Sequence, residues 1–164
     1  MFKAAIITVS DKGSQGERED KSGELLLSLL MESGFEVAKY VIIPDEQDKI
    51  INQLQAMIEE NITLVITSGG TGLAPRDETP EATRAVIEKD VPGIQEEMRR
   101  LSIQKTPHGM LSRGIAGIKD QTLIINFPGS PKAVKECFQT IEPALKHALE
   151  TLTGNAQDCA QPEQ

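Results

Sequence analysis

The strongest constraint on the fold is a regular alternation of short β-rich runs and helical patterns along the 164 residues. Each β-rich run is followed by a polar loop and then by apolar residues at helical spacing. The predicted strands are residues 3–10, 36–43, 61–67 and 121–126. Such alternation implies right-handed crossovers between parallel strands, with helices on both faces of one sheet. The sequence therefore predicts an α/β fold, a three-layer α/β/α sandwich with a mainly parallel sheet.

The helical patterns complete this arrangement within one domain. They cover residues 23–31, 50–58, a helix starting at Thr79-Pro80, residues 91–105, and a long helix from Ser130 to about Thr153. The stretch between residues 106 and 117 is less regular and receives no element. A chain of this length, with 38% hydrophobic and 26% charged residues, is typical of a single globular domain. We predict a domain over residues 1–153 and a polar, frayed tail over residues 154–164.

The net charge and the hydropathy pattern argue against nucleic acid and membranes as partners. The chain has 17 Lys and Arg against 25 Asp and Glu, a net charge of −8 that opposes binding to nucleic acid or to an anionic membrane. No apolar run approaches the roughly 20 residues that cross a bilayer, and the N-terminus does not resemble a signal peptide. We therefore expect a cytoplasmic protein. Cys137 and Cys159 lack metal-ligand spacing and are interpreted as free thiols.

Four loops follow the predicted strands, and parallel strands would bring them to one edge of the sheet, where such folds bind ligands. They are rich in Gly, Ser, Thr, Asp and Pro. Because the chain is acidic, an anionic substrate would need backbone N–H groups, helix N-termini, a few cations or a divalent metal here. The loops are residues 10–20, 44–48, 68–77 and 126–132.

The most informative loop begins with a Gly-rich segment, residues 68–72, directly after a buried strand. Three glycines in four positions let the backbone approach a ligand and expose N–H groups to an anion. The segment is neither a Walker P-loop nor a dinucleotide fingerprint, and a tight turn for packing would explain the glycines about as well. Asp77 favours phosphate binding over a simple packing turn, because a carboxylate beside a phosphate site is a natural Mg²⁺ ligand. Thr79-Pro80 is more simply an N-cap followed by Pro.

The other loops give weaker signals. Asp45 could bind metal, but with Asp48 it could equally be a capping pair for the next helix, and spacing alone favours capping. Ser10 and Asp11 could line a site or a solvated turn. Lys132, in the first turn of the last helix, opposes the helix dipole, which is mild support for an anionic ligand. No histidine, serine or cysteine stands in a pattern typical of a nucleophile or its base.

These residues carry a resemblance to the MogA/MoaB family of molybdenum cofactor biosynthesis, closer to its MoaB branch. The matching motifs are Thr8-Val9-Ser10-Asp11, Thr67-Ser68-Gly69-Gly70-Thr71-Gly72, Asp77, Thr79-Pro80, Leu111-Ser112-Arg113 and Asn126-Phe127-Pro128-Gly129. The resemblance covers roughly residues 3–153. It implies a molybdopterin-binding fold, assembled as a trimer or a hexamer. It also implies adenylyl transfer, in which Mg²⁺ and ATP activate molybdopterin as its AMP ester with release of pyrophosphate.

The resemblance also implies roles for single residues. Asp45 and Asp77 would be the catalytic carboxylates and the Mg²⁺ ligands, which reverses the preference for Asp45 as a cap. The residues implied to bind molybdopterin or the nucleotide are Ser10, Asp11, Ser68, Gly69, Gly70, Thr71, Gly72, Arg113, Pro128, Gly129, Ser130 and Lys132.

Two other functions remain open from the sequence. One is a domain like that of CinA-type nucleotide pyrophosphatases. The other is a molybdopterin- or nucleotide-binding oligomeric module without catalysis, because some MoaB-type proteins are of this kind. The presence of both Asp45 and Asp77 favours the enzyme. The expected partners are molybdopterin, ATP, further copies of the chain and the protein that inserts molybdate.

Overall fold

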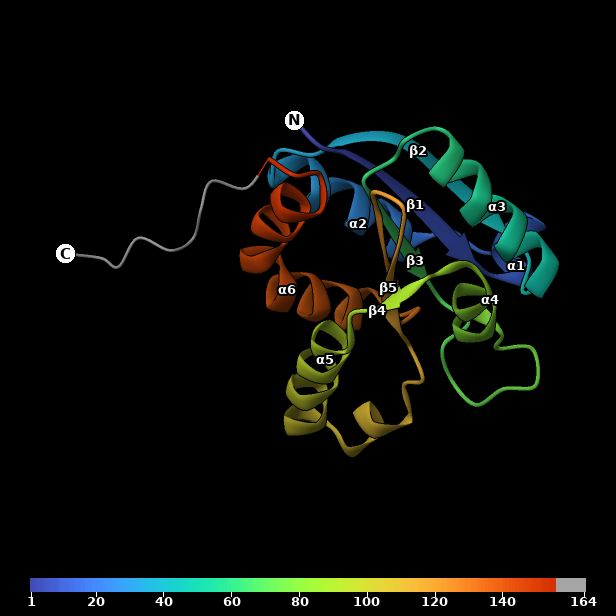
Figure 1. Cartoon of the computed structure of the whole chain (residues 1–164). Coiled ribbons are helices and arrows are strands. Elements are labelled where there is room, and N and C mark those ends of the chain that lie inside the picture. Colours follow the sequence, from blue (N-terminus) through green and yellow to red (C-terminus); the bar gives the residue numbers. More distant parts are fainter. Residues whose placement is uncertain (156–164) are drawn as a thin grey trace.

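The computed structural model describes residues 1–155, and the predicted tail and Cys159 lie almost entirely outside them. A six-stranded sheet in the order β2-β1-β3-β6-β5-β4 forms the middle layer (Figure 1). Its strands are β1 (Lys3–Val9), β2 (Glu36–Ile43), β3 (Leu64–Ser68), β4 (Lys89–Asp90), β5 (Ala116–Lys119) and β6 (Thr122–Phe127). The first four in spatial order run parallel, while β5 and β4 are antiparallel to their neighbours. The mainly parallel α/β sheet is confirmed.

Helices cover both faces of this sheet (Figure 1). The long helices are α2 (Lys21–Glu32), α3 (Gln47–Glu59), α5 (Pro92–Lys105) and α6 (Pro131–Leu152). The shorter ones are α1 (Asp11–Ser14), α4 (Thr79–Val86) and the 3₁₀ helix η1 (Pro107–Leu111). None of the helices in residues 1–155 is long and apolar enough to cross a bilayer.

Strand alternation divides the core into two layers. On β1, Ala4 and Ile6 face the cluster that contains α2, α5 and α6, while Ala5 and Ile7 face the cluster that contains α3 and α4. All four side chains are fully buried. Because successive strand residues point to opposite faces, an apolar run without polar interruption marks a strand covered on both sides. The three-layer sandwich follows from these runs.

The sheet order places a crevice at the carboxyl end of β1 and β3. Strand order reverses between these neighbours, since β2 lies on one side of β1 and β3 on the other. After β1 the chain continues to α2 on one face, and after β3 it continues to α4 on the opposite face. Loops that diverge in this way open a crevice outside the carboxyl ends of the strands, where open α/β sheets bind ligands.

Candidate active site

The crevice is a cavity of about 750 Å³ that all four strand-end loops line. This volume is within the range of small-molecule sites in proteins. Residues predicted for the site that line the cavity are Ser10, Asp45, Ser68, Gly69, Gly70, Asp77, Gly129 and Ser130. The prediction that these distant segments meet at one edge of the sheet is therefore confirmed.

The Gly-rich segment comes closer to its neighbours than any side chain would permit. Gly69 and Gly70 have φ of +100° and +65°, in the left-handed region that glycine adopts without strain. A Cβ on Gly69 would lie 2.4 Å from the carbonyl oxygen of Val9, at the end of β1. A Cβ on Gly70 would lie 2.3 Å from Thr79 Oγ1 and 3.3 Å from Asp45 Oδ1. These glycines bring the backbone of the segment against the carboxylate of Asp45.

Asp45 is held by a reciprocal pair of hydrogen bonds with Asp11. The backbone N–H of Asp11 donates to Asp45 Oδ2 at 2.8 Å, and the N–H of Asp45 donates to Asp11 Oδ1 at 3.0 Å. Asp45 Oδ1 therefore faces Gly70. Burial raises the pKa of Asp45, and the neighbouring carboxylates of Asp11 and Asp77 raise it further against the lowering hydrogen bond from Asp11. Among the described residues Asp45 has no ion pair of its own, and Arg76 offsets its charge only from a distance.

Asp77 is held in a similar way within its own loop. The N–H of Ala74 donates to Asp77 Oδ2 at 3.0 Å, and the N–H of Asp77 donates to the carbonyl of Ala74 at 2.9 Å. In the described part of the chain, no hydrogen bond engages Oδ1 of either Asp45 or Asp77. The two catalytic candidates therefore each keep one oxygen for a ligand.

Asp11 takes a supporting position outside the cavity. The guanidinium of Arg76 donates from Nε to Asp11 Oδ2 at 2.6 Å and from Nη2 to Asp11 Oδ1 at 2.9 Å. This bidentate contact lowers the pKa of Asp11. Through it the tip of the β3–α4 loop (residues 69–78) is joined to the segment after β1.

Several cavity residues were not predicted. They belong to the turn before α2 and its first residues: Arg18, Glu19, Asp20, Lys21 and Ser22. Asp20 caps α2 by accepting from the N–H of Gly23, and the hydroxyl of Tyr40 donates to its other oxygen at 2.6 Å. Asp is a preferred N-cap residue, so Asp20 just before the apolar helical pattern was a visible cap signal, but only the fold shows that this helix begins at the cavity.

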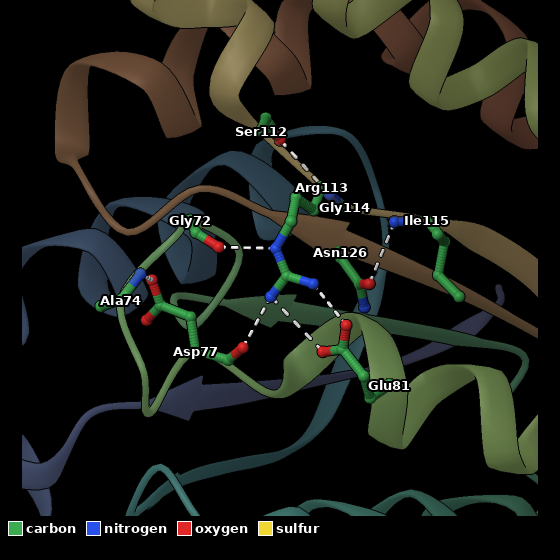
Figure 2. Close-up of polar contacts among 9 residues, drawn as sticks. All are labelled: Gly72, Ala74, Asp77, Glu81, Ser112, Arg113, Gly114, Ile115 and Asn126. Atoms are coloured by element: carbon green, nitrogen blue, oxygen red, sulfur yellow. Dashed lines mark hydrogen bonds and ion pairs between the residues drawn. The ribbon is translucent and has the colours of Figure 1, made fainter.

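Other predicted residues lie outside the cavity lining: Asp11, Thr71, Gly72, Arg113, Pro128 and Lys132. Lys132 is exposed on α6. Pro128 lines a smaller cavity of about 230 Å³ between α5, η1 and α6. Arg113 contacts the β3–α4 loop from outside, as Figure 2 shows.

Two predicted caps are wrong. The residue before α3 is Glu46, and the Asp45 side chain binds Asp11 instead of the helix N-terminus, so the capping pair with Asp48 is absent. Thr79 is the first residue of α4, and its hydroxyl donates to the carbonyl of Gly69 at 3.0 Å. Both side chains thus stabilise the rim of the cavity in place of a helix end. The long helix predicted from Ser130 does begin there, since Ser130 is its N-cap and its Oγ accepts from the N–H of Ala133 at 3.3 Å.

The two carboxylates suit Mg²⁺ binding in which substrate phosphates and water complete the coordination. Among the described residues no group of three or more His, Cys, Asp or Glu side chains could hold a metal by itself. Asp45 and Asp77 nevertheless flank one loop, each with a carboxylate oxygen that no hydrogen bond occupies. Mg²⁺ commonly binds through one or two carboxylates together with substrate phosphates and water. The pair can therefore hold the ion once a phosphate substrate is present.

The sheet order, the switch-point cavity and the Gly-rich segment define a doubly wound α/β protein with a ligand-sized cavity at the carboxyl ends of its strands. A family model described as "Probable molybdopterin binding domain" matches residues 5–147. The chain belongs to this molybdopterin-binding family.

Individual relatives agree with this assignment. A molybdopterin adenylyltransferase of Helicobacter pylori is 41% identical over 153 residues, covering 92% of this chain and 87% of the relative. The molybdenum cofactor synthesis protein cinnamon of Drosophila melanogaster is 46% identical over 147 residues, which are 88% of this chain but 24% of the fly protein. The crystal structure of the molybdopterin biosynthesis enzyme MoaB from Thermus thermophilus superposes with a TM-score of 0.89 at 48% identity, covering 94% of this chain and 98% of the other.

Proposed function

We propose that this protein is a molybdopterin adenylyltransferase, which uses Mg²⁺ and ATP to form molybdopterin-AMP and pyrophosphate in molybdenum cofactor biosynthesis. The observation that carries the proposal is the common cavity of the four loops, bounded by the Gly-rich segment and by Asp45 and Asp77. Relatives named for this activity cover most of the chain.

Some cavity residues would bind the substrates, and others would neutralise the negative charge of the phosphates. Within residues 68–72, the backbone N–H of Gly70 would hold nucleotide phosphate, because the N–H of Gly69 donates to the carbonyl of Phe127 and the last two residues lie outside the cavity lining. The cations Arg18 and Lys21 at the cavity wall add positive charge to a chain that is otherwise acidic. Ser10, Gly129 and Ser130 would line the molybdopterin side. Such transfer depends mainly on positioning and on neutralising charge, so no covalent nucleophile is required.

Asp45 and Asp77 would hold Mg²⁺ through their unoccupied oxygens. When bound, the ion would neutralise phosphate charge that builds up during transfer. The raised pKa of Asp45 is consistent with this role, because a carboxylate without an ion pair of its own has more to gain from a cation.

The proposal also covers the oligomeric state, the cellular compartment and the partner protein. From the family resemblance we include a homotrimer or a hexamer of two trimers, action in the cytoplasm, and contact with the protein that inserts molybdate. The non-catalytic binding module remains the competing function, and the presence of both carboxylates on one cavity favours the enzyme.

The test is formation of molybdopterin-AMP from molybdopterin and Mg·ATP by purified protein. Asp77→Asn and Asp45→Asn should each lower the rate by at least about 10²-fold, because the amide keeps the shape and removes the charge. Asp48→Asn is the matched control, since Asp48 is an exposed carboxylate on the same side of the molecule. A wild-type protein that binds molybdopterin but forms no AMP ester would establish the binding module instead.

A further inference from the structure

Arg113 contacts the β3–α4 loop at both of its ends. It follows η1, and its backbone N–H donates to the carbonyl of Thr71 at 2.9 Å. Its guanidinium donates from Nε to the carbonyl of Gly72 at 2.7 Å and from Nη2 to the carbonyl of Asp77 at 2.6 Å (Figure 2). One residue thus fixes the distance between the beginning of the loop and the residue that carries the candidate catalytic carboxylate.

Glu81 on α4 anchors the same guanidinium. Its Oε1 accepts from Nη1 of Arg113 and its Oε2 accepts from Nη2 at 3.4 Å. The contact lowers the pKa of Glu81, which keeps its carboxylate ionised. All three guanidinium nitrogens of Arg113 are therefore engaged by protein oxygens. Their planar, fixed geometry is what allows two carbonyls and a carboxylate to be bound together, and a lysine ammonium lacks it.

The guanidinium of Arg113 binds the backbone carbonyl of Asp77. The carboxylate of Asp77 is oriented from within the loop by the N–H of Ala74. At the other side of the loop, Thr79 donates to the carbonyls of Gly69 and Gly70. The loop is therefore tied at its base by Thr79 and across its width by Arg113. Without the Arg113 side chain, the loop would keep its ties through Thr79 and through Arg76, but the carbonyl of Asp77 would lose its contact with the segment after η1.

We propose that Arg113, anchored by Glu81, is a positioning residue that holds Asp77 at the distance from Asp45 at which both carboxylates bind one Mg²⁺. This proposal rests on the proposed function and departs from the implied role of Arg113 as a ligand of substrate. Arg113 does not line the cavity, and its donors already have protein acceptors.

A positioning role and a substrate-binding role of Arg113 predict different activities for variants of Glu81. If Arg113 positions the loop, Glu81→Gln and Arg113→Gln both weaken the contacts that the Arg113 guanidinium makes with the β3–α4 loop. Both should raise the Mg²⁺ concentration for half-maximal activity about tenfold and lower kcat by about 10–100-fold, because small displacements of catalytic groups are costly. The double variant should be no worse than Arg113→Gln, since neighbours in one network are not additive. Arg113→Lys should resemble Arg113→Gln.

The matched control is Arg84→Gln, which removes an arginine of α4 whose guanidinium pairs with the carboxylate of Asp90 on β4 instead of with the loop. It should leave kcat, the KM for ATP and the Mg²⁺ dependence unchanged. A result in which Arg113→Gln raises KM while Glu81→Gln behaves as wild type would overturn the proposal, because it indicates a direct contact of Arg113 with substrate.

A second measurement does not depend on activity. Hydrogen–deuterium exchange of the peptide over residues 69–78 should be at least about tenfold faster in Arg113→Gln and in Glu81→Gln, with unchanged exchange in α6. Unchanged exchange of the loop would overturn the proposal even if activity falls. If the wild-type protein forms no molybdopterin-AMP, the proposed function fails by itself, and loop exchange together with calorimetric Mg²⁺ affinity still decides whether Arg113 positions Asp77.

Discussion

At the scale of single residues, the site is built from groups that constrain one another. Asp11 and Asp45 each accept a hydrogen bond from the other's backbone, and Arg76 pairs directly with Asp11 while it acts on Asp45 only as a weaker charge without a hydrogen bond. One carboxylate is thereby neutralised as part of the scaffold and the other is left charged at the cavity. Such an arrangement costs stability in the absence of a cation, as functional sites often do.

The first prediction follows from the raised pKa of Asp45. The folded state binds a proton on Asp45 more tightly than the unfolded state, so this group lowers stability as pH rises above the ordinary aspartate pKa. Asp45→Asn lacks the charge and can still accept from the N–H of Asp11. In EDTA, its melting temperature should exceed that of the wild type at pH 7, with a smaller difference at pH 4. An Asp45→Asn variant less stable than wild type at pH 7 would contradict this account.

The second prediction concerns Gly70 and uses Gly16 as its control. Both have positive φ, of +65° and +74°, but a Cβ on Gly16 meets nothing within 4 Å. Gly16→Ala should therefore cost only the left-handed strain of about 1–2 kcal/mol. Gly70→Ala should cost more, because its Cβ would overlap Thr79 Oγ1, and it should also weaken Mg·ATP binding measured by calorimetry. Equal costs and unchanged nucleotide affinity would remove the Gly-rich segment from the binding site.

At the scale of elements, one buried side chain connects the two halves of the sheet with a helix. Asn126 of β6 donates to Thr67 Oγ1 on β3 at 3.0 Å and to Thr83 Oγ1 on α4 at 2.9 Å. Its Oδ1 accepts from the N–H of Ile115 at 3.1 Å, the contact that Figure 2 shows. Asn126 is 1% exposed. This network fixes α4, which carries Glu81, relative to the segment that carries Arg113.

The third prediction is that Asn126→Ala lowers the free energy of unfolding by about 1–3 kcal/mol, because it leaves buried donors and acceptors without partners. Urea denaturation measures this change. Asn52→Ala on α3, at an exposed position, should stay within about 0.5 kcal/mol of wild type. A cost of Asn126→Ala as small as that of the control would show that water or a shifted backbone satisfies the network.

The elements also show what the sequence could predict. β1, β2, β3 and β6 were predicted because each is rich in apolar and β-branched residues, and their order along the chain placed the four loops at one edge. β4 and β5 were missed because they have only two and four residues, and β4 pairs with β5 across a long sequence separation. Their contact needs Gly117, where a Cβ would lie 2.7 Å from the carbonyl oxygen of Lys89. The loop that contains Arg18 was placed at this edge, but neither Arg18 nor Lys21 was named for the site, since only the tertiary fold brings these side chains to the cavity.

At the scale of the whole molecule, exposed apolar side chains lie on α5 and η1, away from the cavity. Ile103, Met110 and Leu111 are 43%, 60% and 46% exposed there. The α5–η1 unit projects from the end of the sheet, as Figure 1 shows. Neighbouring exposed apolar side chains are typical of interaction surfaces. Because the family resemblance implies a trimer or hexamer, we expect copies of this chain to cover these side chains.

The fourth prediction is that light scattering gives a mass of three or six times 17.9 kDa at micromolar concentration. Met110→Glu should lower that mass toward the monomer, because it would bury a charge without a partner at the interface. Met31→Glu is the control, since Met31 is equally exposed at 61% but lies on α2. A monomeric wild-type protein would contradict the oligomer. An intact oligomer of Met110→Glu would place the interface elsewhere, on apolar surface that neither α5 nor η1 provides.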